Sequence, residues 1–149
     1  MQSIGAATSD DNFAAAIAAA KAADVCIVTL GLAFDSYCGR STCPEGKNCD
    51  VCEAEGRDRD TIDLASGQAD MVQALRAALG PSKKLVAVLI HGGTMAFTNQ
   101  TMDALDAVLD AWYPGLGGGE AVAATLFGDQ SPAGVYVCVC VWVCVFGCL

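Results

Sequence analysis

Apolar residues fall into short runs along the chain, and the spacing within each run separates helices from strands. Residues 12–23 are rich in alanine, which is typical of a helix, whereas the β-branched run at 25–30 is too short for a helix and fits a buried strand. Residues 67–79 place apolar side chains on one helical face, and residues 85–90 are apolar throughout, as in a parallel strand covered on both faces. The rest of the chain predicts a helix at 102–106, a strand at 107–112 and a helix at 117–127.

This alternation of helices and strands predicts the fold class. Strands that alternate with helices through short connections form a mostly parallel sheet with right-handed crossovers and helices on its faces, an α/β sandwich. Functional groups in such sheets gather at the carboxyl ends of the strands. We therefore expect the site among the long polar segment 31–66, residues 91–94 and residues 113–120.

Composition and charge narrow the class of protein. The chain has 149 residues, of which 54% are hydrophobic and 17% charged, so a single folded domain is expected and general disorder is excluded. The net charge is −9 and no cluster of Lys and Arg is present, which argues against a nucleic-acid or anionic-membrane partner. Because no apolar stretch reaches about 20 residues, the sequence predicts no transmembrane helix.

Residues 135–149 differ from the rest of the chain in their repetitive composition. Valine stands at every odd position from 135 to 145, alternating with cysteines and aromatic residues, and both faces of the resulting strand pattern are apolar. A GT dinucleotide repeat translates as alternating Val and Cys, so we interpret this tail as read-through into repetitive, intronic DNA. The alternative is an edge strand, although natural edge strands carry charges or proline. The domain is therefore expected to comprise residues 1–134.

The densest group of charged side chains lies in the segment from Glu53 to Asp60. In an extended loop alternate side chains share a side, which brings together Glu53, Glu55, Arg57 and Arg59. Two neighbouring carboxylates disfavour each other's ionisation, so one can stay protonated as a general acid, while Arg57 or Arg59 holds the other ionised. The alternative is a solvated turn whose ion pairs contribute little.

Three further features have alternative interpretations. His91, the only histidine, either lines a pocket or makes structural hydrogen bonds at the end of a strand. Trp112 fits either a core position or a stacking surface. The glycine-rich segment 115–120 resembles a dinucleotide-binding loop, but Glu120 stands where its third glycine would be and would repel a pyrophosphate.

The order of motifs along the chain resembles the C-terminal α/β sandwich domain of glycoside hydrolase family 3, which includes β-xylosidases and β-glucosidases. The resemblance runs from about residue 14 to residue 134. The motifs that carry it are Glu53–Arg59 (EAEGRDR), His91–Thr94 (HGGT), Trp112–Gly115 with Gly118 and Gly119, Leu126–Asp129 (LFGD), and Pro132–Gly134.

The resemblance implies an exo-acting retaining β-glycosidase that hydrolyses O-glycosyl bonds with two carboxylates, without a cofactor or a metal. The nucleophilic Asp belongs to an N-terminal barrel, and the general acid/base Glu belongs to a loop of the sandwich domain. By its position in the motif, Glu53 is the candidate acid/base and Glu55 is the second choice. The chain holds no barrel, so we expect a fragment, with a sandwich incomplete at both ends, that is inactive alone. Its expected partners are a β-linked oligosaccharide or glycoside and the missing barrel.

Four cysteines lie close together in an apparent insertion at residues 33–52, immediately before the acid/base motif. They are Cys38, Cys43, Cys49 and Cys52. Four cysteines allow three disulfide pairings, whereas only the last two have the spacing of a zinc-binding pair. We favour disulfides, which would suit a secreted or vacuolar parent enzyme.

Two other functions remain as alternatives. A non-catalytic remnant or sugar-binding module would share the motifs without supplying a catalytic acid, and a barrel encoded in frame upstream would argue against it. A doubly wound nucleotide-binding domain would share the α/β pattern, and nucleotide binding by the isolated domain would favour it.

Overall fold

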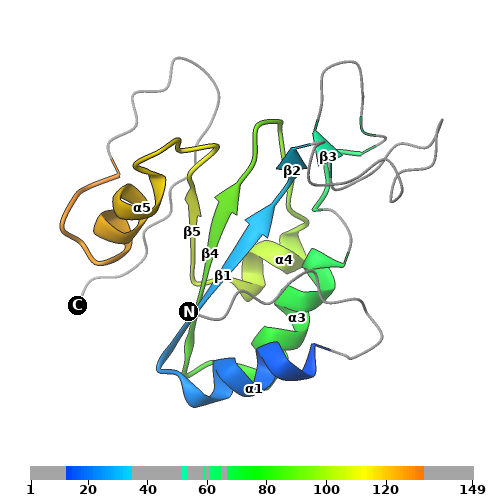
Figure 1. Ribbon diagram of the computed structural model, residues 1–149. Helices are drawn as coiled ribbons and strands as arrows, with labels where there is room; N and C mark the ends of the chain where they lie inside the picture. The colour runs from blue at the N-terminus through cyan, green and yellow to red at the C-terminus, as the bar shows by residue number, and fades with distance from the viewer. Residues whose placement is uncertain (1–12, 35–51, 54–58, 60, 65–66, 133–149) are drawn as a thin grey trace.

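The computed structural model describes residues 13–34, 52–53, 59, 61–64 and 67–132 (Figure 1). Its elements are α1 (Ala14–Ala22), β1 (Val25–Gly31), β2 (Ala33–Phe34), β3 (Cys52–Glu53), α3 (Gln68–Leu79), β4 (Lys84–Ile90), α4 (Asn99–Ala104), β5 (Ala107–Asp110) and α5 (Gly118–Leu126). The tail at 135–149 lies outside the described residues, as do Cys38, Cys43 and Cys49, so the predictions made for them stay predictions.

The main sheet has three strands in the order β1-β4-β5, and both pairs are parallel. Helix α3 connects β1 to β4 along the chain, and α4 connects β4 to β5. A second, two-stranded sheet joins β2 to β3, also in parallel. The predicted fold class, a mostly parallel sheet with flanking helices, is therefore confirmed.

One face of the sheet forms the core with α1, α3 and α4. On β1 the side chains of Val28 and Leu30 are buried, and on β4 those of Leu85, Ala87 and Leu89. The helices supply the matching surface with Ala20, Val72, Leu75, Leu79 and Ala104. Each large aliphatic side chain buried there contributes roughly 1.5–3 kcal/mol. Side chains at every second position of the strands pack against the apolar face of α3, which is the pattern that the sequence predicts.

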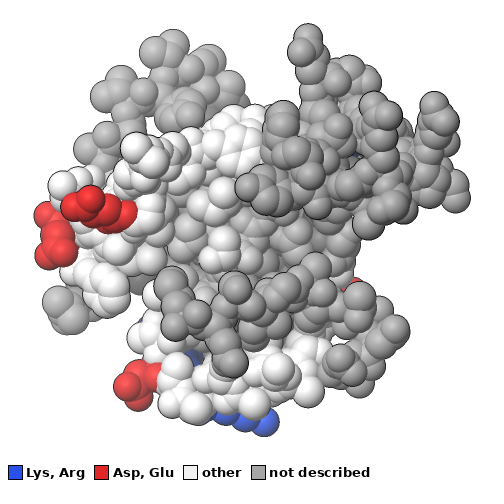
Figure 2. All heavy atoms as spheres, in the orientation of Figure 1, with Lys and Arg blue, Asp and Glu red and all other residues white. Residues whose placement is uncertain are grey.

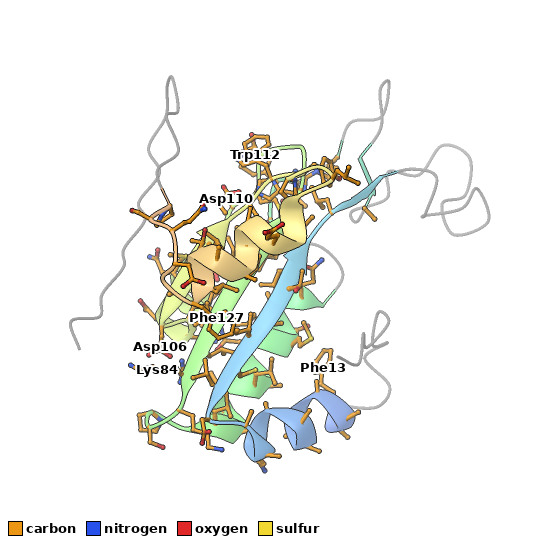
Figure 3. All side chains as sticks on the ribbon, turned by 60° about the vertical axis from the view of Figure 1, so that its left-hand side comes forward. Phe13, Lys84, Asp106, Asp110, Trp112 and Phe127 are labelled. Atoms are coloured by element: carbon orange, nitrogen blue, oxygen red, sulfur yellow. The ribbon has the colours of Figure 1, made fainter. Side chains whose placement is uncertain are left out.

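The opposite face carries α5 and is less completely covered. Figures 1 and 3 show α5 on the other side of the sheet from α3 and α4. Within α5, all of which is described, Gly118 is the buried residue, and Val25 and Ile27 on β1 are each 48% exposed. In the view of Figure 2 the described charged groups gather toward α5 and at the α1 end. The central strand β4 is covered here at Val88, but β1 is not.

Several element boundaries differ by one to three residues from those predicted, and two of these differences have a clear physical cause. Helix α4 begins at Asn99 rather than at 102, because Thr98 caps it: its Oγ1 accepts a hydrogen bond from the Thr101 amide at 3.2 Å. Strand β5 ends at Asp110 rather than at 112, because Trp112 adopts a left-handed φ of 51°. Strands β2 and β3 lie inside the segment predicted as a loop, and two residues are too few to produce a recognisable period.

The exit of β1 depends on Gly31. Its φ is +150°, and a Cβ built there would lie 1.8 Å from the carbonyl oxygen of Ile90 on β4. The side-chain amide of Gln68, at the start of α3, holds the same residue: its Nε2 donates to the Gly31 carbonyl and its Oε1 accepts from the Gly31 amide, each at 2.8 Å. Sheet and helix are thereby joined at the point where the chain turns toward β2.

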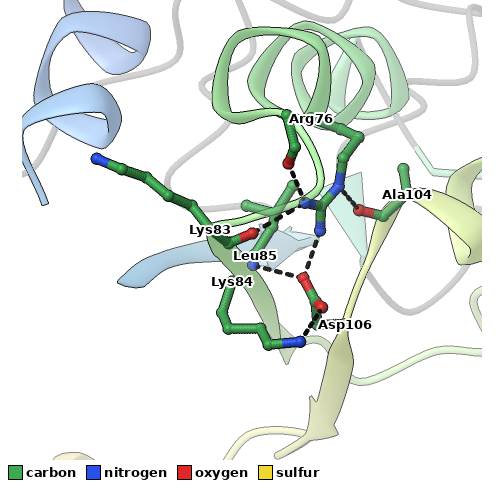
Figure 4. A network of polar contacts seen from close by, with 7 residues as sticks. Arg76, Lys83, Lys84, Leu85, Ala104 and Asp106 are labelled. Atoms are coloured by element: carbon green, nitrogen blue, oxygen red, sulfur yellow. Dashed lines mark hydrogen bonds and ion pairs between the residues drawn. The ribbon is translucent and has the colours of Figure 1, made fainter. Parts of the chain in front are cut away.

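At the other end of the sheet, Arg76 connects α3 to its neighbours (Figure 4). Its Nε donates to the carbonyl oxygen of Ala104 at 2.6 Å, and its Nη1 donates to the carbonyls of Gly80 at 2.9 Å and Lys83 at 3.0 Å. Its Nη2 bonds to the carboxylate of Asp106. One guanidinium thus fixes the end of α3, the start of β4 and the turn into β5.

The Asp106 carboxylate receives two more donors. The Leu85 amide donates to Oδ2 at 2.9 Å and Lys84 Nζ donates to Oδ1 at 2.9 Å. Burial by itself would raise the pKa of Asp106, but these hydrogen bonds and the charge of Arg76 outweigh it and lower the pKa to about 2. The ionised form is therefore the one that stabilises this end of the fold.

We expect Gly31→Ala to lower the free energy of unfolding by about 3 kcal/mol or more, because the new methyl group meets the Ile90 carbonyl. Denaturant unfolding of the full chain followed by circular dichroism measures it. The matched control is Gly119→Ala, in α5, where a Cβ meets nothing within 4 Å. The control should leave stability within about 1 kcal/mol or raise it. Equal effects of the two variants would contradict the close approach.

We expect Asp106→Asn to lower the free energy of unfolding at pH 7 by about 1 kcal/mol, once solvent screening is allowed for. The pKa of Asp106 in the folded state, about 2, lies below its ordinary value of 3.8. Its contribution is therefore present above about pH 4 and is lost as the pH falls toward 2. Denaturant unfolding at several pH values should show wild type and variant converging there. The control Asp129→Asn changes an exposed carboxylate beyond α5, and a pH-independent difference for Asp106→Asn would contradict the assignment.

Candidate active site

The carboxyl ends of β1, β4 and β5 meet at one edge of the sheet, because all three strands are parallel. The segments that follow these strands carry most of the residues singled out in the sequence. Figure 3 shows Asp110 and Trp112 at this edge and Lys84 with Asp106 at the opposite edge. The candidate site is therefore built from three connecting segments at the carboxyl edge.

The first segment brings Glu53 to this edge. Beyond β1 the Leu32 amide donates to the Ile90 carbonyl at 3.0 Å, and the chain continues directly into β2. Strand β3 pairs with β2 in the register Ala33↔Cys52 and Phe34↔Glu53. The backbone of the first-choice acid/base residue thus lies beside Phe34, three residues past the end of β1, whereas the second choice, Glu55, lies outside the described residues.

The chain returning from the acid/base segment is attached to the segment after β4. The guanidinium of Arg59 donates through Nη2 to the Thr94 carbonyl. Three residues later the Ile62 carbonyl accepts from the Ala96 amide at 2.7 Å, and Asp63 forms a parallel bridge with Ala96. Both ends of the segment that joins Glu53 to Arg59 are therefore anchored at the carboxyl edge.

His91 lies in the same segment and is buried, with 3% of its surface exposed. Its Nδ1 is 2.6 Å from the Gly93 carbonyl oxygen, and its Nε2 is 3.1 Å from Oδ1 of Asp110. The ring is thereby held between the backbone after β4 and the carboxylate at the end of β5. Of the two interpretations of His91 given above, the structural hydrogen-bonding role is the one that its contacts support.

Trp112 completes this group at the end of β5. Its indole lies 4.9 Å from the His91 ring between centroids, with a tilt of 36°, and its amide donates to Asp110 Oδ1 at 3.3 Å. The left-handed φ of Trp112 turns the chain away from the sheet after Asp110. Trp112 therefore packs on the histidine and is part of the support for this edge.

Sequence analysis missed Asp110 as the partner of His91. The two residues are 19 positions apart, and nothing in their spacing connects them. The parallel pairing of β4 with β5 does so: Asp110 lies opposite Leu89, beside the start of the His91 segment. The signal that could have found it is the position of an acidic residue at the end of a predicted strand.

The described residues contain no group of three or more His, Cys, Asp or Glu side chains arranged to hold a metal ion. Among those same residues no helix is both long enough and apolar enough to cross a bilayer. Helix α5 follows the glycine-rich segment and has Glu120 in its first turn. A carboxylate there competes with any phosphate for the positive end of the helix, which argues against the nucleotide-binding alternative.

Comparison with known proteins identifies the family. The glycosyl hydrolase family 3 C-terminal domain model matches residues 1–136. The xylan 1,4-beta-xylosidase of Xylanibacter ruminicola is 41% identical over 80 residues, which are 54% of this chain and 9% of that protein. A beta-xylosidase of Formosa agariphila is 31% identical over 126 residues, covering 85% of this chain and 15% of that protein. The periplasmic beta-glucosidase of Salmonella typhimurium is 39% identical over 80 residues, covering 54% and 10%.

The chain spans only a small part of the length of these relatives, and no solved structure matches it significantly. The match to the family model nevertheless covers most of the 149 residues and includes the motifs from which the resemblance was drawn. The parallel sheet with flanking helices agrees with the α/β sandwich that this resemblance implies. The chain therefore belongs to the glycosyl hydrolase family 3 C-terminal domain family.

Proposed function

We propose that this chain supplies the general acid/base carboxylate of an exo-acting retaining β-glycosidase of the β-xylosidase or β-glucosidase type. The relatives named above, two β-xylosidases and a β-glucosidase, support this class of activity. The observation that carries the proposal is the parallel pairing of β3 with β2, which sets the Glu53 backbone at the carboxyl edge of the sheet. Glu53 is the proposed acid/base, and Glu55 remains the second choice.

The proposed role divides into two proton transfers. In the first step the protonated carboxyl gives its proton to the departing glycosidic oxygen while a nucleophilic carboxylate attacks the anomeric carbon. In the second step the same group, now a carboxylate, takes a proton from the water that hydrolyses the glycosyl-enzyme intermediate. The substrate class is a β-linked oligosaccharide or glycoside.

The nucleophile is proposed to come from a separate barrel domain. Retaining enzymes hold their two carboxyl groups about 5–5.5 Å apart, so the barrel must face the carboxyl edge of this sheet. The chain alone, with one half of such a pair, is not expected to form the covalent intermediate.

We expect Glu53→Gln to abolish acid catalysis in a chimera in which the full chain replaces the matched segment of the Formosa agariphila relative. For xylobiose, whose leaving group needs a proton, kcat/KM should fall about 10²–10⁴-fold. For 2,4-dinitrophenyl β-xyloside, whose leaving group departs without one, kcat/KM should fall far less. Added azide, which needs no general base, should restore turnover and give a glycosyl azide. Steady-state kinetics and product analysis measure these effects.

The matched control is Glu55→Gln in the same chimera. It should lower kcat/KM equally for both substrates and gain nothing from azide. If Glu55→Gln rather than Glu53→Gln distinguishes the two leaving groups, the second-choice residue is the acid/base. If neither variant does so in an active chimera, the domain is a non-catalytic module and the proposal fails.

A further inference from the structure

Trp112 has a backbone conformation that bulky residues rarely adopt. Its φ of 51° lies in the left-handed region, where glycine is the residue that fits without strain. A glycine would make the same turn after β5, so the backbone path does not account for an indole at this position. Strained positions of this kind cluster at sites where a side chain has a function.

The surrounding groups fix the indole of Trp112 in one place. It lies 4.9 Å from the His91 ring between centroids, with a tilt of 36°. The His91 ring is itself held from two sides, because Nδ1 is 2.6 Å from the Gly93 carbonyl oxygen and Nε2 is 3.1 Å from Oδ1 of Asp110. The same Oδ1 accepts from the Trp112 amide at 3.3 Å. One carboxylate therefore holds both the backbone of Trp112 and the ring on which its indole packs.

Support of the strand end alone does not require this arrangement. His91 is 3% exposed, and a buried imidazole loses hydration that an aliphatic side chain would not have to lose. What its two hydrogen bonds add is a single orientation of the ring. Trp112 packs on this buried ring and remains partly exposed. A partly exposed aromatic side chain that is held in one orientation is suited to bind a second flat, apolar surface.

A sugar ring offers such a surface. The C–H groups of a β-linked xylose or glucose ring make its faces apolar, whereas the hydroxyl groups lie at its rim. Trp112 lies at the carboxyl edge (Figure 3), which is the edge proposed above to carry the acid/base carboxyl. That carboxyl protonates the departing oxygen, while the nucleophile of the barrel attacks the other sugar at its anomeric carbon. The departing sugar therefore lies on the side of this chain.

We propose that Trp112 binds the departing sugar by stacking its indole on one face of the ring, an inference that rests on the proposed function. His91 and Asp110 are positioning residues, which do not touch the sugar and act by holding the indole. The ligand is a pyranose leaving group, and a leaving alcohol without a ring gains nothing from Trp112.

The test compares two leaving groups in the chimera described above. They are the sugar of xylobiose and the alcohol of 2,2,2-trifluoroethyl β-xyloside, which needs a proton but has no ring. Trp112→Ala should raise KM for xylobiose about tenfold and leave kcat within about twofold, because it removes binding rather than chemistry. Neither constant for the trifluoroethyl xyloside should change by more than about twofold. Trp112→Phe keeps a flat ring and should raise KM for xylobiose less than about threefold.

The matched control is Phe127→Ala. It removes an aromatic ring that is 80% exposed and that lies away from Trp112 in Figure 3, so it should change the kinetics of neither substrate. An equal loss for both substrates with Trp112→Ala would overturn the stacking role and make Trp112 a structural residue.

Asp110 tests the positioning role. Asp110→Ala removes the acceptor for His91 and for the Trp112 amide and should raise KM for xylobiose about fivefold, whereas Asp110→Asn keeps an acceptor oxygen and should stay within about twofold of wild type. In the Trp112→Ala background Asp110→Ala should add less than a twofold effect on KM, because the group that it holds is gone. The same increase in both backgrounds would overturn the positioning role.

The failure of this inference differs from the failure of the proposed function. Glu53→Gln distinguishes leaving groups by their need for a proton, whereas Trp112→Ala distinguishes them by the presence of a ring. If only Glu53→Gln has its expected effect, the acid/base role stands and the sugar contact is wrong. If only Trp112→Ala has its expected effect, the sugar contact stands and the acid/base role of Glu53 is contradicted.

Discussion

The close approach of Gly31 to Ile90 is the constraint on which the carboxyl edge depends. A side chain at residue 31 would collide with the Ile90 carbonyl, so the strand pairing that places β1 against β4 at this point requires glycine. Gln68 then holds the amide and the carbonyl of the same residue from α3. Because β2 follows within two residues and pairs with β3, an error at Gly31 would displace the backbone of Glu53 as well.

The two edges of the sheet use charge in different ways. At the amino edge Arg76 and Asp106 satisfy several backbone groups and each other, so that their charges hold α3, β4 and the turn into β5 in place. At the carboxyl edge His91 and Asp110 support the chain, while one nitrogen of the Arg59 guanidinium has no acceptor among the residues that the structure describes. A polar network that is fully satisfied makes its part of the fold rigid, whereas a partly satisfied network does so less.

Several features could be predicted from periodicity because local rules and packing agree. The alanine-rich α1, the apolar stripe of α3 and the apolar run of β4 each fit the core that they build. The prediction missed β2 and β3, because a strand of two residues is too short to show a period. Helix α4 begins three residues earlier than predicted, because Thr98 caps it. The assignment of Glu53 came from the order of motifs, and its catalytic role stays a prediction.

The sequence by itself determined the α/β class, the order of the longer helices and strands, and the family, because each depends on contiguous runs of residues or on motifs that follow one another. Tertiary structure decided which distant residues meet. The pairing of His91 with Asp110 follows from the register of β4 and β5, and the anchoring of Arg59 on Thr94 follows from the chain running back beside the segment after β4. The physical reason is that strand register, which depends on packing across the whole sheet, sets these contacts, and no local pattern encodes it.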